Sequence, residues 1–298
     1  MAQKVRKAVI AAAGFGTRFL PQTKAMPKEM LPLVDKPIIQ YIAEQLVEAG
    51  IEDIIIVSGY SKRSIEDHFD APNEDLLNNL RTGGPKKAHY IAETQRISEM
   101  ANFAYVRQKG PYGTGTPIMN AAHLIGDEPF IYTFADDITI GTPNLYQQMI
   151  DAYEEFGGSV IACLRITEAE DFKRYGIFGG EKVRDDLIKA TNIIEKPGKD
   201  KAPSDFAGIG GHLLTPDVFK YVDKGAASLQ PGQEFYATDQ LFMPMAADGL
   251  PIYGLEIKHN GRYDTGNPAG YVKAVVDFAL QRNDIGPELR EYLQKILQ

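Results

Sequence analysis

The chain has 298 residues, 44% hydrophobic and 24% charged, which is typical of a soluble globular protein and excludes a disordered or fibrous one. Its formal net charge of −8 argues against a broad nucleic-acid-binding surface, so any polyanionic partner should be a small molecule. No leader-like segment and no run of about eighteen apolar residues occurs, so we expect neither secretion nor a membrane partner. The single cysteine, Cys163, lies in an apolar stretch and is expected to be a buried thiol of a cytoplasmic protein.

Short apolar segments alternate with amphipathic ones in the first half of the chain, which is the pattern of repeated βα units. Five segments are predicted to be strands, namely 7–13, 53–58, 103–107, 130–135 and 159–166. Two helices are predicted between them, over 37–49 with Gly50 as the stop and over 116–126 with Thr116 as the N-cap. We therefore expect an α/β fold with a Rossmann-like, mostly parallel or mixed sheet between layers of helices.

The pattern changes after about residue 167, where glycine-rich turns separate short strands. A helix is predicted over 238–247, and two further helices are predicted in 268–298 with a break near 283–287. No Ser/Pro/Gly-rich linker separates the two halves, so we expect 1–298 to form a single domain with a small β extension.

A glycine-rich loop follows the first predicted strand. A dinucleotide-binding fingerprint needs a third glycine and an immediate helix, but Phe19 and three prolines follow Gly14-Phe15-Gly16 here. A Walker loop is excluded as well, because no Gly-Lys pair stands at the required spacing. What remains is a loop of exposed backbone N–H groups with Arg18, Lys24 and Lys28 downstream, which suits a flexible triphosphate. The alternative is an ordinary turn with solvated lysines.

The stretch GFGTRFLPQTKAMPKEMLPLVDKPIIQY, residues 14–41, resembles the signature loop of nucleotidyltransferases that make nucleotide sugars, and most closely the bacterial UTP:glucose-1-phosphate uridylyltransferases. The family elements G-x-G-T-R, P-K-x-x-L-P and D-K-P are all present. The resemblance covers nearly the whole chain and implies a nucleotide-diphospho-sugar transferase fold. It implies a nucleotide-binding half over about 1–166, a sugar-phosphate half over about 167–267 and C-terminal helices over 268–298.

The resemblance also implies the residues of a nucleotide site. Those expected to bind the nucleotide through the first strand and its loop are Ala12, Ala13, Gly14, Gly16 and Thr17. Arg18 is expected to hold the β- and γ-phosphates, and Lys28, in an extended segment, is expected to reach the α-phosphate. Gln108 and Gly113 are similar to the residues that read uracil. The chain reads G-T-G-T at 113–116 where the family usually has G-L-G-H, which weakens the implied base and sugar preference.

Two aspartates are similar to the family's metal ligands. Asp136 follows a predicted strand, where ligands bind in open α/β sheets, and Asp264 lies in the segment GRYDTGNPAGY. Together they are expected to hold one Mg²⁺ against the phosphates. The residues expected to bind the sugar phosphate are Gly176, Glu195 and Gly210, with Lys196 as a catalytic cation.

These residues imply transfer of UMP from UTP to glucose 1-phosphate. Two alternatives stay open at this point: a thymidylyltransferase or other nucleotidylyltransferase acting on a hexose 1-phosphate, and a non-catalytic regulatory protein that binds nucleotide sugars. We expect Mg²⁺ as cofactor, no nucleic-acid or membrane partner, and a homodimer or homotetramer.

Overall fold

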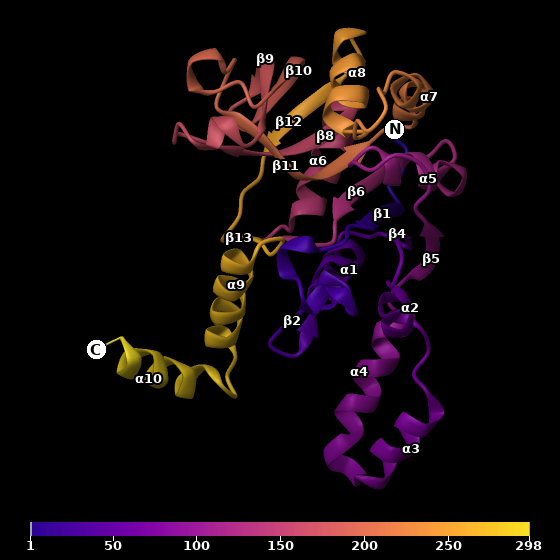
Figure 1. Cartoon of the computed structure of the whole chain (residues 1–298), viewed down its shortest axis with the longest axis vertical. Coiled ribbons are helices and arrows are strands. Elements are labelled where there is room, and N and C mark those ends of the chain that lie inside the picture. The colour runs from indigo at the N-terminus through magenta and orange to yellow at the C-terminus, as the bar shows by residue number, and fades with distance from the viewer. Residues whose placement is uncertain (1, 298) are drawn as a thin grey trace.

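A nine-stranded mixed sheet forms the centre of the molecule in the computed structural model, which describes residues 2–297 (Figure 1). In sheet order its strands are β5 (Asn102–Arg107), β4 (Asp53–Ser58), β1 (Lys7–Ala12), β6 (Phe130–Phe134), β11 (Phe206–Leu214), β8 (Ser159–Arg165), β12 (Ile252–Glu256), β10 (Leu187–Glu195) and β9 (Gly176–Arg184). The first four are parallel to one another, whereas β11, β10 and β9 introduce antiparallel pairs. The predicted α/β fold class is therefore confirmed, with a parallel half and a mixed half.

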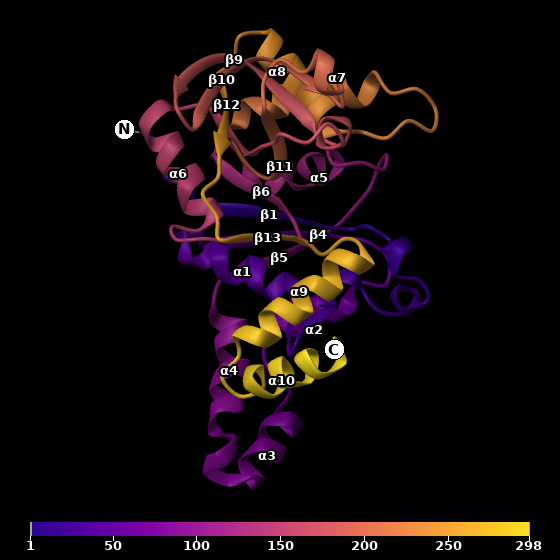
Figure 2. The ribbon, with the colours of Figure 1, turned by 90° about the vertical axis from the view of Figure 1, so that its left-hand side faces the viewer.

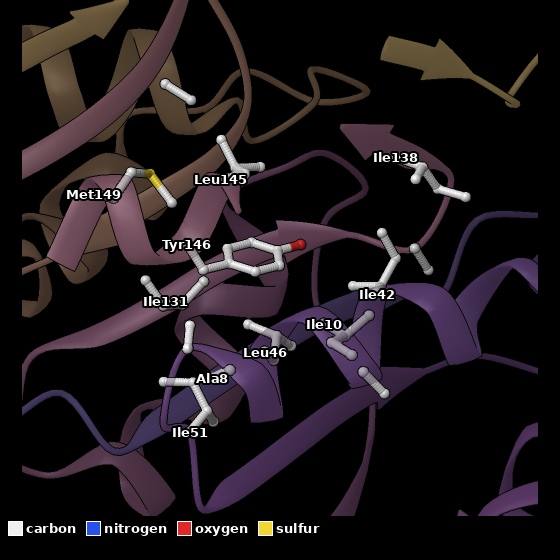
Figure 3. Close-up of a cluster of buried hydrophobic side chains, with 14 of the residues drawn as sticks. Ala8, Ile10, Ile42, Leu46, Ile51, Ile131, Ile138, Leu145, Tyr146 and Met149 are labelled. Carbon is white, nitrogen blue, oxygen red and sulfur yellow. The ribbon is translucent and has the colours of Figure 1, made fainter. Parts of the chain in front are cut away.

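Helices cover both faces of the sheet. Alternating residues of β1 divide between two apolar cores, since Ala8 and Ile10 belong to one and Val9 to the other. The first core, shown in Figure 3, joins β1 and β6 to α1 (Ile38–Glu48) and α6 (Leu145–Phe156). The second core includes side chains of α5 (Thr116–Ile125), α7 (Phe219–Ala227) and α8 (Met243–Ala247). Both faces are thus sealed, as a largely parallel sheet requires.

The predicted helices form with small differences at their ends. The predicted helix 37–49 is α1, which ends before Gly50 at φ 88°. Thr116 is not the N-cap of α5, because Gly115 takes that position and the Thr116 hydroxyl donates to the Pro111 carbonyl at 2.6 Å. Residues 238–247 form a π-helical turn, Thr238–Phe242, that continues into α8.

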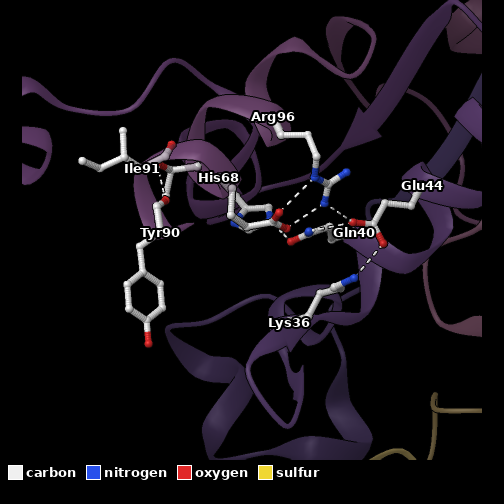
Figure 4. A network of polar contacts seen from close by, with 9 residues as sticks. Lys36, Gln40, Glu44, His68, Tyr90, Ile91 and Arg96 are labelled. Carbon is white, nitrogen blue, oxygen red and sulfur yellow. Dashed lines mark hydrogen bonds and ion pairs between the residues drawn. The ribbon is translucent and has the colours of Figure 1, made fainter. Parts of the chain in front are cut away.

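A helical projection between β4 and β5 was not anticipated from the sequence. It consists of α2 (Arg63–Phe69), α3 (Glu74–Thr82) and α4 (Ala88–Glu99), and it extends away from the sheet in Figures 1 and 2. α3 buries only Leu77 and α4 only Ile97, so neither helix carries the broad apolar face by which a core helix is recognised in a sequence. Polar contacts tie α4 to α1, because Arg96 donates to Glu44, which also accepts from Lys36 (Figure 4).

The chain ends with two helices, α9 (Pro268–Gln281) and α10 (Gly286–Ile296), broken where the sequence predicted. Two short ladders complete the fold: β2 (Pro32–Leu33) pairs with β3 (Lys36–Pro37), and β7 (Asp137–Ile140) pairs with β13 (Gly261–Asp264). Within residues 2–297, no helix is both long and apolar enough to cross a membrane. Cys163 is fully buried, as predicted, and burial raises the pKa of its thiol.

His212 on β11 is buried among the rings of Tyr132, Phe134 and Phe242, with Nδ1 3.3 Å from the Tyr132 carbonyl oxygen. Burial lowers the pKa of His212 to about 4. The unfolded chain, with a His pKa of about 6.5, therefore binds a proton more readily than the folded chain. The stability that neutral His212 confers is present above pH 6.5 and is lost as the pH falls towards 4.

Between pH 6.5 and 4, protonation of the His212 site should lower the unfolding free energy of the wild type by up to about 3 kcal/mol. Because Gln does not titrate, the His212→Gln variant should lack this part of the decrease. Urea unfolding of both proteins at several pH values measures this difference. His123→Gln, at an exposed position on α5, is the matched control and should keep the wild-type slope. Parallel pH profiles for wild type and His212→Gln would contradict the assignment.

Candidate active site

Two adjoining cavities open at the carboxyl ends of the parallel strands, where ligands bind in α/β sheets. One, of about 400 Å³, lies between the loops that follow β1, β5 and β6. The other, of about 360 Å³, lies among β6, β9, β10 and β11. Both are lined by Thr114, Phe134, Asp136 and Tyr236. The two cavities therefore form one continuous cleft with Asp136 at the junction.

The loop after β1 folds as successive 3-10 turns, because prolines prevent a longer helix. Gly16 has φ 65°, and its carbonyl oxygen accepts from the Thr23 hydroxyl at 2.7 Å. Ala13 and Gly14 line the 400 Å³ cavity, whereas Thr17 faces a separate hollow beside residues 60–62, and Ala12 is buried in β1. The loop thus presents its first residues, and not Thr17, to the cavity.

Lys28 begins the third 3-10 turn, Lys28–Met30, so the prediction of an extended segment at this residue is wrong. Pro27 ends the extended part, and the turn directs the Lys28 side chain across the cavity to Asp136, with Nζ 2.5 Å from Oδ2. Burial alone lowers the pKa of Lys28, but the charge and hydrogen bond of Asp136 outweigh it, so the pKa is raised. Lys28 is therefore a fixed cation at the cleft junction.

The two predicted metal ligands lie together although they are 128 positions apart in the sequence. Pairing of β13 with β7 places Asp264 opposite Asp137, and Thr265 donates from its amide and its hydroxyl to the Asp136 carbonyl. A Cβ on Gly266 would lie 2.6 Å from Asp136 Oδ2 and 3.1 Å from Asp264 Oδ1. Both carboxylates therefore face one small space that only a glycine leaves open.

This donor set fits a hard divalent cation, which prefers carboxylate oxygens and shares its remaining positions with phosphate and water. Among residues 2–297 no third carboxylate, histidine or cysteine completes an all-protein metal cage. Arg18 lies beside the same turn, since its Nη1 donates to the Gly266 carbonyl at 3.2 Å. The site therefore gathers two cationic side chains, Arg18 and Lys28, around two carboxylates.

The far end of the 400 Å³ cavity is closed by two segments that bond to each other. Phe235 donates to the Tyr112 carbonyl at 2.6 Å and accepts from Gly115 at 2.7 Å. Gly113 has φ 123°, and a Cβ there would lie 2.4 Å from the Phe235 carbonyl oxygen, so only glycine fits. Gln108 and Gly113, the two predicted base-reading residues, both line this cavity.

Thr114, within the unusual G-T-G-T segment, makes two hydrogen bonds to neighbouring segments. Its hydroxyl accepts from the Ala237 amide at 3.0 Å, and its carbonyl accepts from the Tyr132 hydroxyl at 2.6 Å. Only the first of these contacts needs the threonine side chain, so the departure from the family pattern adds one hydrogen bond that holds residue 114 beside Ala237 at the junction of the two cavities.

The 360 Å³ cavity contains the predicted sugar-phosphate residues except one. Gly176 opens β9 directly opposite Glu195 at the end of β10, and a Cβ on Gly176 would lie 2.9 Å from Glu195 Oε2. Gly210 on β11 lines the same cavity. Lys196 does not line it: this residue has φ 47°, its side chain is 58% exposed, and its Nζ lies 3.3 Å from Glu195 Oε1. Lys196 is therefore an exposed cation at the rim, beside Glu195.

The sequence assigns no role to a partly buried ion pair in this cavity. Arg262 Nη2 lies 2.6 Å from Asp137 Oδ2, while Asp137 Oδ1 and Arg262 Nε are buried without a hydrogen-bond partner. Burial raises the pKa of Asp137, and Arg262 opposes that increase. Arg174 and Tyr175 also line the cavity. The only sequence signal was proximity, since Asp137 follows Asp136 and Arg262 precedes Asp264 by two residues.

The fold and this cleft define a nucleotidyltransferase, and the model of the family described as nucleotidyl transferase matches residues 7–280. The chain belongs to that family. It is 42% identical to the UTP--glucose-1-phosphate uridylyltransferase YngB of Bacillus subtilis, over 100% of this chain and 97% of the relative. It is 43% identical to a second B. subtilis UTP--glucose-1-phosphate uridylyltransferase, over 99% and 98%.

Solved structures give the same result. A UDP-glucose pyrophosphorylase complexed with UDP-glucose matches with a TM-score of 0.80 and 36% identity, over 94% of this chain and 100% of that one. A UTP-bound UGPase from Acinetobacter baumannii matches with a TM-score of 0.87 and 30% identity, over 98% and 99%. The predicted family membership is therefore confirmed.

Proposed function

We infer that this chain is a UTP--glucose-1-phosphate uridylyltransferase, which transfers UMP from UTP to glucose 1-phosphate and releases pyrophosphate. Relatives of that name over the whole chain support the inference. The observation that carries it is the junction of the two cavities at Asp136, because a nucleotide in one and a sugar phosphate in the other would meet there.

The reaction needs charge neutralisation more than proton transfer. A phosphate oxygen of glucose 1-phosphate attacks the α-phosphorus of UTP in line, and the bond to the β-phosphate oxygen breaks as pyrophosphate leaves. The attacking oxygen is already anionic, so no side chain has to remove a proton. The protein has to hold two anions together and stabilise the charge that spreads over the transferred phosphoryl group.

The proposed roles of the cations follow from their positions. Arg18 and the backbone of the loop after β1 bind the β- and γ-phosphates, since Arg18 lies beside the Asp264 turn. Lys28 binds the α-phosphate from the cavity junction. Lys196 closes over the sugar phosphate from the rim, and its exposed side chain leaves it free to do so.

We propose Mg²⁺ as the cofactor, held by Asp136 and Asp264, because both carboxylates face the space beside Gly266. When bound, Mg²⁺ neutralises charge on the nucleotide phosphates. Lys28 contributes in the same region, since it occupies Asp136 Oδ2 in this structure and would exchange that carboxylate for a phosphate oxygen.

The proposed substrate contacts are to uracil and glucose. Gln108 and Gly113 read the uracil edge, which offers donors and acceptors together. Gly176 lets the hexose approach the backbone of β9, Glu195 accepts from sugar hydroxyls, and Gly210 contributes the wall of the cavity on β11, packed against Asp137 and Phe134.

We further propose a cytoplasmic protein whose residues 1–298 form one nucleotidyltransferase domain, divided near 166 and 267 as the sequence suggests. The free, buried Cys163 fits a reducing compartment. A homodimer or homotetramer is proposed on the exposed apolar side chains of α10, Tyr292 and Ile296.

Pyrophosphate release from each of several nucleoside triphosphates with each of several hexose 1-phosphates tests this function. We expect UTP with glucose 1-phosphate to be the preferred pair, with dTTP used at least roughly 10-fold less well, because dTTP carries an extra methyl group and lacks the ribose 2′-hydroxyl of UTP. A preference for dTTP would indicate a thymidylyltransferase. Binding of UDP-glucose without turnover of any pair would indicate a regulatory binding protein.

Lys196→Ala should lower kcat/KM by roughly a hundredfold or more, since it removes one cation from the developing phosphoryl charge. The same pyrophosphate assay measures the effect. Lys199→Ala is the matched control, because Lys199 is exposed three residues away and donates only to the Thr167 carbonyl. Near-normal activity of the Lys196 variant would remove this residue from the mechanism.

Asp264→Asn should raise the Mg²⁺ concentration for half-maximal rate by at least roughly tenfold, because a charged oxygen ligand is replaced by a neutral amide. A Mg²⁺ titration of the rate, after removal of metal with EDTA, measures the shift. Asp223→Asn, which makes the same change at an exposed position of α7, should leave the titration unchanged. An unchanged titration for Asp264→Asn would show that Asp264 does not hold the metal.

A further inference from the structure

A buried ion pair lies beneath the cavity proposed for the nucleotide and has no part in the roles above. Lys62 Nζ lies 2.7 Å from Glu29 Oε2, and the two side chains are 5% and 1% exposed. This is the most buried ion pair among residues 2–297, since the next, Arg262 with Asp137, is 15% and 12% exposed. Glu29 also lines the 400 Å³ cavity.

A gain in folding stability does not explain why this ion pair is buried. Burial raises the pKa of Glu29 and lowers the pKa of Lys62, so for each group the loss of water outweighs the attraction of its partner. Glu29 Oε1 is buried without any hydrogen-bond partner. Buried pairs of this kind are often no more stable than apolar side chains of the same volume. The charged side chains of Glu29 and Lys62 are therefore better explained by the segments that they hold in position.

The backbone around Lys62 is shaped to insert this side chain. Ser61 has φ 58°, a left-handed conformation that a non-glycine residue adopts only when its surroundings impose it. Gly59 approaches the loop after β1 so closely that a Cβ there would lie 2.9 Å from the Ala13 carbonyl oxygen. Residues 59–62, which connect β4 to α2, are therefore pressed against the loop proposed to bind the phosphates.

The pair is connected to the reacting centre through one peptide bond. Glu29 follows Lys28 in the same 3-10 turn, and Lys28 lies 2.5 Å from Asp136. Positive and negative side chains therefore alternate along the series Lys62, Glu29, Lys28 and Asp136. Lys62 lies after β4, Glu29 and Lys28 lie after β1, and Asp136 lies after β6. Because Lys62 anchors Glu29 from below, the turn cannot rotate without breaking a buried ion pair.

We propose that Lys62 is a positioning residue, which acts through Glu29 to hold the ammonium group of Lys28 beside the α-phosphate. The proposal rests on the function proposed above, in which Lys28 binds that phosphate. A lysine on a long flexible side chain has to be directed to its target, and a displacement of about 1 Å can reduce a rate by roughly a hundredfold.

A double-mutant cycle of Lys62→Met and Lys28→Ala tests the proposal. Lys62→Met should lower kcat by roughly 10- to 100-fold with little change in KM for UTP or glucose 1-phosphate. In the Lys28→Ala background the same change should have almost no further effect, because the residue that Lys62 positions is gone. Independent, multiplicative losses would overturn the proposal, and so would a loss confined to KM.

Lys62→Met leaves Glu29 buried without a partner, so the paired variant Glu29→Gln with Lys62→Met keeps the volume and removes both charges. If Lys62→Met does not fold, the paired variant takes its place in the cycle, with the same expected coupling to Lys28→Ala. Lys36→Met is the matched control: Lys36 pairs with Glu44 at 2.8 Å, neither lines the cleft, and activity should stay within twofold of wild type. A wild-type chain that forms no UDP-glucose would overturn both proposals, whereas an active wild type with independent losses would overturn only the positioning role.

Discussion

The crowding of negative charge at Asp136 and Asp264 is the constraint on which the rest of the cleft depends. Two carboxylates that face one small space repel each other, and the space exists only because residue 266 has no side chain. Cations have to compensate. Lys28 already does so at 2.5 Å from Asp136, and Arg18 reaches the backbone of the same turn. The groups that would bind phosphates are thus the groups that this charge attracts.

The mixed half of the sheet supplies the other side of this arrangement. After β12 the chain returns to the parallel half, where β13 pairs with β7 and brings Asp264 to the end of β6. The β9–β10 hairpin then forms the opposite wall, with Gly176 and Glu195 in register. A purely parallel sheet would supply the first cavity alone. The antiparallel strands add the second cavity and join it to the first at Asp136.

The parallel half of the sheet was predictable from the sequence because its strands are buried on both faces and are therefore continuously apolar. α1 was predictable because it has an apolar face between Pro37 and Gly50. The projection α2–α4 was missed because it buries few apolar side chains. Family motifs located Asp136 and Asp264, but their proximity depends on the β13–β7 register. The pair Glu29–Lys62 left no local signal, and the only signal for Asp137–Arg262 was proximity to the predicted metal ligands, since each pair joins residues far apart in the chain.

The two ends of the cleft differ in rigidity, and this difference follows from burial. At the proposed nucleotide end, Lys28 is restrained by Asp136 and by a turn anchored on a buried ion pair. At the proposed acceptor end, Lys196 extends from the rim with more than half of its side chain in solvent. A restrained cation loses little conformational entropy when an anion arrives, whereas an exposed lysine loses up to about 2 kcal/mol of rotamer freedom when it is immobilised. At the nucleotide end, Lys28 is therefore already restrained and only exchanges Asp136 for a phosphate oxygen, whereas the acceptor end is completed when an anion fixes Lys196 in place.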